Sequence, residues 1–283
     1  MPKRTIQWGI AAILLFLAVW LWSLLLDKRQ VFSVTFFDVG QGDSIFIETE
    51  HGHQILIDGG PDGKIVEKLG QVLPPGDKKL DLAIITHQDN DHAGGFIPLF
   101  KAYDADHVMW TGMAKDTEIF EALSRSLREE ERQGTVLHTA HAGQIISWGE
   151  ANASIEVLHP EKPDKDNGLG GSNENSVVLL LKKGGKSFLF TADIEKKAEA
   201  YLLSKEEDVR ANVLKVAHHG SKSSTSNPFV AAVKPEIAVI QVGQKNKYGH
   251  PDAKVLESLR RYGINVFRTD EEGDIRIRIT NGK

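Results

Sequence analysis

Apolar residues recur along this chain in two patterns, one typical of strands and one typical of helices. Short apolar or alternating runs predict strands at residues 31–37, 45–48, 54–57, 80–85, 107–110, 177–181, 186–191, 212–217 and 235–242. Amphipathic segments predict helices at residues 64–72, 96–103, 117–133, 195–204 and 252–262. Two final runs, 266–270 and 275–279, predict a closing hairpin about Gly273. The alternation from residue 31 onward predicts a mixed α and β domain.

A separate apolar run, Trp8 to Leu26, precedes these elements and carries no charge. As a helix it would span about 28 Å, close to the hydrocarbon thickness of a bilayer. The run is longer than the core of a typical signal peptide, and no small-residue cleavage site follows it. The sequence therefore predicts a membrane anchor or signal segment over residues 1–30 and a separate folded domain over 31–283. The basic N-terminus favours a transmembrane helix with the domain on the extracytoplasmic side.

Composition narrows the chemistry that the domain can use. The 283 residues include no cysteine, which excludes disulfides, thiolate metal ligands and cysteine nucleophiles. A net charge of −5 gives no broad basic surface for non-specific duplex binding, although a local basic groove is compatible with it. The part after the apolar run is long enough for one domain with a large core.

The densest group of metal-capable side chains follows the predicted strand 80–85, within the segment Thr86-His87-Gln88-Asp89-Asn90-Asp91-His92. Because residues two apart in an extended segment lie on one face, His87 and Asp89 can converge on one ion. Asp91 and His92 follow the turn and face elsewhere, which predicts a second ion about 3.5–4 Å from the first. Carboxylates this close would repel each other without a cation. The alternative, a solvated acidic loop, leaves both histidines unexplained.

Polar side chains also follow two later strands, in His218-His219-Gly220-Ser221-Lys222-Ser223 and in Lys247-Tyr248-Gly249-His250. One of the adjacent histidines would complete the metal shell, and we assign this role to His218. The other, with Ser221, Lys222 and Ser223, would donate to a phosphate. The sequence does not fix which histidine does which. A segment rich in Pro, Lys, Asp and Gly, residues 161–171, is predicted to form a mobile rim of the site.

Five phrases of the sequence resemble the metallo-beta-lactamase superfamily, and in particular its ComEC-like branch of competence proteins. They are Asp38-Val39-Gly40-Gln41-Gly42-Asp43-Ser44, Leu56-Ile57-Asp58-Gly59-Gly60, the His87 to His92 motif, Phe190-Thr191-Ala192-Asp193-Ile194 and Asn246-Lys247-Tyr248-Gly249-His250-Pro251. The resemblance implies a four-layer αββα sandwich with the metal site at the strand ends. Most of the superfamily has histidine where Asp89 stands, and a carboxylate favours manganese or magnesium more than imidazole does.

The resemblance also implies roles for individual residues. Asp193 would bridge the metal ions, Asp58 would orient a ligand histidine through a hydrogen bond, and His250 would bind phosphate or protonate the leaving group. Where many members place a ligand histidine before strand 177–181, this chain has Asn173 and Asn175. The predicted site therefore comprises metal ligands His87, Asp89, Asp91, His92, Asp193 and His218, catalytic residues Asp91, His219 and His250, substrate-binding residues Asn175, Ser221, Lys222, Ser223 and Tyr248, and the supporting Asp58.

These features predict a metal-dependent hydrolase with two divalent ions, manganese or zinc, with magnesium also compatible. A phosphodiesterase or nuclease acting on DNA is favoured, because two loops supply donors to phosphate oxygens and because the ComEC-like branch is linked to DNA uptake. The partners would be DNA or another phosphodiester, the membrane, and a separate DNA channel protein. The alternatives are a zinc-dependent lactone, thioester or β-lactam hydrolase on the same fold, and a non-catalytic, membrane-tethered binding protein.

Overall fold

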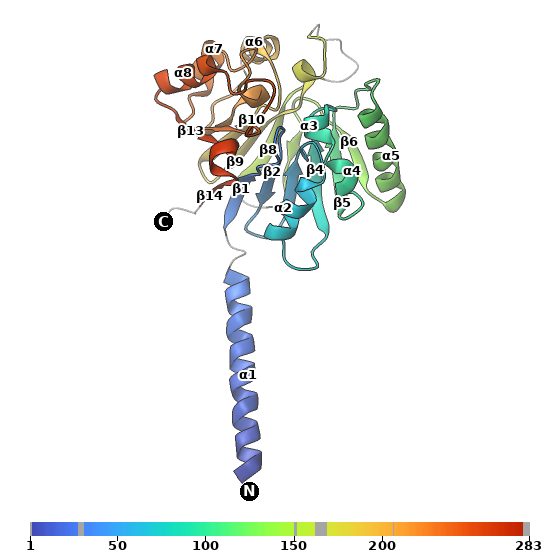
Figure 1. The fold of residues 1–283 in the computed structure, drawn as a ribbon, viewed down its shortest axis with the longest axis vertical. Coiled ribbons are helices and arrows are strands. Elements are labelled where there is room, and N and C mark those ends of the chain that lie inside the picture. The colour runs from blue at the N-terminus through green and yellow to red at the C-terminus, as the bar shows by residue number, and fades with distance from the viewer. Residues whose placement is uncertain (1, 28–30, 150–151, 162–168, 206, 280–283) are drawn as a thin grey trace.

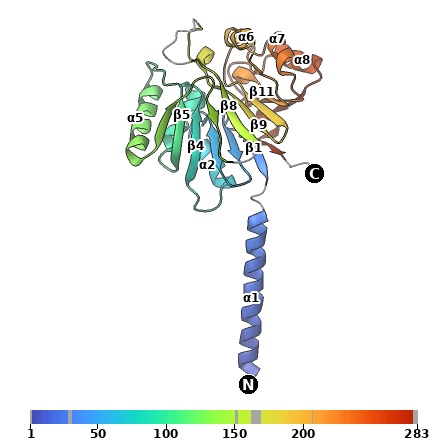
Figure 2. The same cartoon turned by 180° about the vertical axis from the view of Figure 1, so that it is seen from behind.

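The computed structural model describes residues 2–27, 31–149, 152–161, 169–205 and 207–279, and it contains two seven-stranded sheets that pack face to face (Figures 1 and 2). The strand order of the first sheet is β14-β1-β2-β3-β4-β5-β6, and that of the second is β13-β12-β11-β10-β9-β8-β7. The first sheet comprises β1 (Phe32–Phe36), β2 (Ile45–Glu48), β3 (Gln54–Ile57), β4 (Lys79–Ile85), β5 (Asp104–Trp110), β6 (Val136–Thr139) and β14 (Ile275–Ile279). The second comprises β7 (Ile145–Ile146), β8 (Ala153–His159), β9 (Val178–Lys183), β10 (Lys186–Phe190), β11 (Val213–Lys215), β12 (Ile237–Ile240) and β13 (Asn265–Arg268).

Helices cover the outer face of each sheet, which gives the four layers of an αββα sandwich. The α-helices are α1 (Pro2–Asp27), α2 (Lys64–Val72), α3 (Asn90–Ala93), α4 (Phe96–Leu99), α5 (Glu118–Gln133), α6 (Lys196–Ser204), α7 (Asn227–Val233), α8 (Ala253–Arg261) and α9 (Thr269–Glu272), and the 3-10 helices are η1 (Asn173–Asn175) and η2 (Ala217–Gly220). One apolar core lies between the sheets, and further cores lie under α2, α4 and α5 on one side and under α6, α7 and α8 on the other. The predicted mixed α/β fold with two sheets is confirmed.

The predicted hairpin at the end of the chain is wrong, because the two strands join different sheets. β13 pairs in parallel with β12 of the second sheet, whereas β14 pairs antiparallel with β1 of the first. α9 separates the two strands. Ile275 and Ile279 of β14 are buried in the core between the sheets. Burial of these alternate side chains against the facing sheet therefore decided the position of β14.

The N-terminal prediction also needs correction. A helix that spans a bilayer needs about 20 consecutive apolar residues, and no helix in the described part of the chain is long and apolar enough to do so. The predictions of a transmembrane helix and of an extracytoplasmic, membrane-anchored location are therefore wrong, whereas the membrane as a partner stays a prediction. The division of the chain at residue 30 stays a prediction. Most of the predicted mobile rim, residues 162–168, lies outside the described residues.

The strand directions bring the predicted functional loops to one edge of the sandwich. β3 to β6 run parallel in the first sheet, and β10 to β13 run parallel in the second. The carboxyl ends of parallel strands meet at one edge, where ligands of open α/β sheets bind. The backbone amide of Val177 donates to the carbonyl of Thr86 across the two sheets at 2.9 Å. The loops after β4, β10, β11 and β12 therefore gather in one place.

The loop between β1 and β2 packs its backbone directly against the metal-capable motif. The amide of Asp43 donates to the carbonyl of Asp91 at 3.1 Å. Gln241 Nε2 donates to the carbonyls of Phe37 and Ser44, at 3.0 and 2.8 Å, and so holds both ends of the loop. Gly42 has φ +143°, and a Cβ added there would lie 2.2 Å from the carbonyl oxygen of Asp91. Only glycine permits this approach.

Substituting Gly42 by Ala is expected to lower the free energy of unfolding by about 3 kcal/mol or more, because left-handed backbone strain adds to overpacking. Gly40→Ala is the matched control. Gly40 also has positive φ, +86°, but a Cβ there would meet nothing within 4 Å. Its cost should be the strain alone, about 1–2 kcal/mol. Urea unfolding of both variants measures the difference, and equal losses would show that the contact with Asp91 is unimportant.

Candidate metal centre

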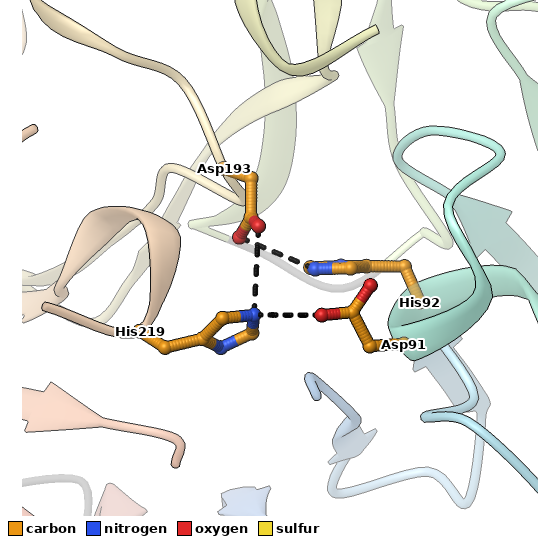
Figure 3. A group of neighbouring side chains, drawn as sticks. All are labelled: Asp91, His92, Asp193 and His219. Carbon is orange, nitrogen blue, oxygen red and sulfur yellow. Dashed lines mark hydrogen bonds and ion pairs between the residues drawn. The ribbon is translucent and has the colours of Figure 1, made fainter. Parts of the chain in front are cut away.

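Four side chains from three separate loops converge at the shared edge of the sheets (Figure 3). Asp91 and His92 come from α3, Asp193 follows β10, and His219 lies in η2. Each offers one ligand atom, and all four atoms lie within 4.8 Å of one another. His92 Nε2 lies 3.2 Å from Asp193 Oδ1, while His219 Nε2 lies 3.2 Å from Asp91 Oδ2 and 3.5 Å from Asp193 Oδ2. The four atoms could therefore share one ion.

Unusual backbone conformations aim the ligands of the second sheet at this point. Ala192, His218 and His219 all have positive φ, at 43°, 49° and 52°. Such left-handed conformations cost residues other than glycine about 1–2 kcal/mol each. His219 Nδ1 lies 2.9 Å from the carbonyl oxygen of Gln241, which can only accept, so Nδ1 donates. This bond turns His219 Nε2 toward Asp91 and Asp193.

Asp58 holds two parts of the motif after β4. Its Oδ1 accepts from the Thr86 amide at 2.8 Å, and its Oδ2 accepts from the Thr86 hydroxyl at 2.7 Å. Asp58 Oδ2 also lies 2.8 Å from His92 Nδ1. A carboxylate in this position makes Nδ1 the donor and leaves Nε2 available as a ligand. Asp58 is thus placed to orient a ligand histidine.

Asp58→Asn is expected to lower metal affinity by about 10- to 100-fold, the usual cost of losing a residue that orients a ligand. Asn tolerates the positive φ of this position, 58°. However, an amide has only one acceptor oxygen, so it cannot accept from the Thr86 amide at one end and from the Thr86 hydroxyl and His92 at the other. The control is Asp81→Asn, since Asp81 also accepts from a backbone amide, that of Gln54, and lies beside a histidine, His53. Metal titration monitored by calorimetry should show wild-type metal affinity in Asp81→Asn and lowered metal affinity in Asp58→Asn.

Alternating charges fill the interior of the centre. Burial by itself would lower the pKa of His219, but Asp193 and Asp43 outweigh it and raise the pKa to about 10. The pKa of His92 is likewise well above its usual value, because Asp193, Asp43 and Asp58 outweigh the effect of burial. Burial would raise the pKa of Asp193, but His219 and His92 hold it well below its usual range. Asp193 is therefore ionised in the folded protein.

Lys215, at the end of β11, adds a buried positive charge that the sequence prediction missed. Its ammonium forms a short ion pair with Asp43, donates to the Ala192 carbonyl at 3.0 Å, and lies 3.8 Å from Asp193 Oδ1. The sequence feature that could have revealed Lys215 is a lysine placed directly after two apolar residues of a predicted strand. Asp43 is itself buried beside Lys215, His92 and His219.

Several buried polar atoms of the centre lack a hydrogen bond of good geometry among the described residues: His87 Nε2 is one, and His92 Nε2 and Asp193 Oδ1 are two more, although these two lie 3.2 Å apart as an ion pair. Such atoms are rare in folded proteins, and a bound ion is one of the accepted explanations. Two imidazoles and two carboxylates are also a ligand set that suits a divalent transition ion. A second acidic group, Asp43, Asp58 and His92, uses His92 Nδ1, which Asp58 already holds. The residues fit one divalent ion, held by Asp91, His92, Asp193 and His219.

The structure does not bring every predicted ligand into this group. His87 is buried with its ring centroid 4.1 Å from that of His92, but it is not one of the four. Asp89 Oδ1 lies 2.5 Å from Lys115 Nζ and accepts from Ser172 at 2.8 Å. His218 Nε2 lies 3.7 Å from Asp193, and its Nδ1 lies 3.2 Å from Glu195. His219 thus occupies the place predicted for His218.

Three of the predicted substrate-binding residues lie beside predicted histidines: Ser221 and Ser223 in the loop after His218, and Tyr248 against His250. Ser221 and Ser223 bond to each other at 2.9 Å, and Ser223 donates to Glu195 at 2.9 Å beside His218. His250 has its ring 5.7 Å from that of His218 and stacks on Tyr248, also at 5.7 Å. Burial, followed by the charges of His219 and His218, lowers the pKa of His250.

Lys222 is exposed. Asn175 Nδ2 donates to the Gly171 carbonyl at 2.9 Å and so binds its own loop.

Two face-to-face sheets with a carboxylate and imidazole cluster at their strand ends define a metallo-hydrolase fold. Residues 37–115 match the family described as the metallo-beta-lactamase superfamily. The chain is 34% identical over 269 residues to ComE operon protein 3 of Bacillus subtilis (strain 168), and this match covers 88% of the chain and 33% of that protein. It is 30% identical over 256 residues to Competence protein ComA of Neisseria gonorrhoeae, again covering 88% of the chain and 33% of that protein.

The resemblance to the ComEC-like branch of competence proteins is therefore confirmed. The chain spans about a third of the length of these curated relatives. Among solved structures, CmlA beta-hydroxylase is similar with a TM-score of 0.56 and 15% identity, over 88% of this chain and 54% of that one. A metallo hydrolase from Ignicoccus hospitalis has a TM-score of 0.51 and 14% identity, over 88% of this chain and all of that one. At such identities these structures support the fold alone.

Proposed function

We propose that this protein is a metal-dependent phosphodiesterase that cleaves DNA. The observation that carries the proposal is a pair of imidazoles beside the metal centre: His218 Nε2 lies 3.7 Å from Asp193, and the ring of His250 lies 6.4 Å from that of His219. Charged and polar donors of this kind suit the oxygens of a phosphodiester. The similarity to competence proteins supports DNA as the substrate, because that similarity extends over 88% of the chain.

The chain would hold its divalent ion with Asp91, His92, Asp193 and His219. When bound, such an ion supplies Lewis acidity and lowers the pKa of water. Asp58 and the carbonyl of Gln241 keep the two histidines oriented through their Nδ1 atoms. The ligand atoms are therefore fixed before substrate arrives, which is the geometry that favours catalysis.

The remaining residues would bind and orient the substrate. His250 is neutral at pH 7 because its pKa is lowered, so it can donate one N–H to a phosphate oxygen while its other nitrogen accepts. His218 is held by Glu195 and is partly exposed, at 23% of its side-chain surface, so it can reach the same phosphate. Tyr248 is 57% exposed and presents a ring on which an unpaired base can stack.

The test uses the full chain, stripped of metal and reconstituted separately with manganese, magnesium and zinc. Each form is assayed on single-stranded DNA, duplex DNA and bis(p-nitrophenyl) phosphate. We expect cleavage that depends on the added ion and is strongest with manganese, since carboxylates make up half of the ligand set. The variant His250→Ala should keep its metal and lose about 10- to 100-fold in kcat/KM, the effect of one hydrogen bond to a charged phosphate oxygen.

Two results would contradict the proposed phosphodiesterase activity or the role of His250. A protein that binds zinc tightly, leaves every phosphodiester intact and turns over a lactone or a thioester would replace this proposal with the second hydrolase class. A His250→Ala variant that cleaves DNA at the wild-type rate would remove His250 from the reaction and leave the metal centre as the remaining support.

A further inference from the structure

Asp89, Lys115 and Ser172 form a compact polar cluster beside the metal centre, which we call the rim cluster. Lys115 Nζ lies 2.5 Å from Asp89 Oδ1 and 3.2 Å from Ser172 Oγ. Ser172 Oγ in turn donates to Asp89 Oδ1 at 2.8 Å. The three residues come from three segments, the residue before α3, the loop before α5 and the residue before η1. Three independent segments thus fix one ammonium group.

The rim cluster lies next to the candidate centre along the chain. Asp89 is the residue that precedes α3, which carries the ligands Asp91 and His92. The segment from Ser172 runs to Val177, whose amide bonds to Thr86 immediately before His87. Lys115 therefore stands at the edge of the centre rather than on a remote surface.

Asp89 is engaged in a way that removes it from metal binding. Its Oδ1 receives both the ammonium of Lys115 and the hydroxyl of Ser172. A divalent ion held by Asp89 would stand close to that ammonium, and two such cations would repel each other strongly in a half-buried site. The donor atoms that lie within 4.8 Å of one another do not include Asp89.

Lys115 keeps capacity to bind a further group. An ammonium has three N–H donors, and among the described residues Asp89 and Ser172 are its partners. The Lys115 side chain is 35% exposed, so the third donor is accessible from solvent. A lysine held by a carboxylate and a hydroxyl also loses little further side-chain entropy when it binds an anion.

We propose that the centre holds one divalent ion and that the ammonium of Lys115 serves as its second fixed cation, binding an anionic phosphate oxygen of the substrate. Asp89 and Ser172 are positioning residues for Lys115. The choice of a phosphate as ligand rests on the proposed function, whereas the metal count does not.

The first experiment counts metal in the full chain by native mass spectrometry at saturating manganese. One ion per chain is expected for the wild type and for Asp89→Asn. Two ions in the wild type and one in Asp89→Asn would overturn the proposal, because Asp89 would then be a ligand. Two ions in Lys115→Met alone would support it, since removal of the ammonium would have opened a second site.

The second experiment measures binding of inorganic phosphate to the manganese-loaded protein by calorimetry, without turnover. Lys115→Met should weaken phosphate binding about 10- to 100-fold, the effect of one charge-assisted contact. Lys79→Met is the matched control, because Lys79 also pairs with a carboxylate, Asp106 at 2.9 Å, on the far end of β4. Equal phosphate affinity in wild type and Lys115→Met would overturn the anion site.

The two experiments separate this inference from the proposed function. If the wild type cleaves no phosphodiester, the proposed function fails, while the metal count and phosphate affinity still decide the role of Lys115. If DNA is cleaved, Lys115→Met should raise KM by a similar 10- to 100-fold factor with less effect on kcat. A loss in kcat alone would place Lys115 in the chemistry instead of in substrate binding.

Discussion

Replacing Asp91 by Asn is expected to lower metal affinity by on the order of 100-fold or more and to abolish metal-dependent hydrolysis. Asp91 is one of the four converging ligands, and its Oδ2 lies 3.2 Å from His219 Nε2. Burial would raise its pKa, but His219 and His92 hold it below the usual range, so it is a carboxylate at neutral pH. An amide of the same shape lacks this charge. Calorimetric metal titration and DNA cleavage measure the two losses.

The variant should nevertheless fold, which separates a binding defect from a structural one. The backbone of this segment is held by bonds from the Asp43 amide to the Asp91 carbonyl, at 3.1 Å, and from the Gly59 amide to the His92 carbonyl, at 2.8 Å, and the substitution keeps both. Loss of the ion pair between Asp91 and His219 lowers the free energy of unfolding, and urea unfolding of the variant measures that loss separately. Asp62→Asn is the control, because Asp62 is an exposed carboxylate that accepts from the Lys64 amide. An Asp91→Asn variant that binds manganese as tightly as this control would exclude Asp91 from the ligand set.

Local patterns allowed most of the fold to be predicted. The helical spacing at residues 64–72 predicted α2 with the bounds that the structure gives, Lys64–Val72. Strand ends were readable because apolar runs stop where polar residues begin, as at Ile85 before the metal-capable motif. Parallel strands then bring such ends together. The neighbourhood of the site was therefore predictable from periodicity and from resemblance.

Contacts between distant segments were not predictable in the same way. The partner of Asp89 is Lys115, 26 residues away in a loop without a regular pattern. The choice between His218 and His219 depends on two consecutive left-handed residues and on the carbonyl of Gln241. The sheet that β14 joins depends on packing against the facing layer. Each of these outcomes is set by tertiary structure, which a local sequence window does not contain.

Metal binding at this centre is expected to release close to two protons per ion at pH 7. Two ligands, His92 and His219, have raised pKa values in the folded protein, that of His219 about 10, so both carry a proton that the ion must displace. The carboxylate ligands are already ionised and release none. Each displaced proton changes apparent affinity tenfold per pH unit, so affinity should rise by up to about 100-fold per unit from pH 6 to 8. Calorimetry in buffers of different ionisation enthalpy counts the protons.

The same shifts set the pH dependence of the metal-free fold. A raised histidine pKa stabilises the folded state fully below the unfolded value of about 6.5, and this contribution is lost as pH rises through the folded value of about 10. The metal-free protein should therefore lose stability over the pH window in which metal affinity increases. His138→Gln is the control, since His138 pairs with His107 outside the centre. In the metal titration, a release of nearly zero protons by the wild type would show that His92 and His219 are neutral before the ion binds. Lys215 alone would then balance the charge of the carboxylates around them.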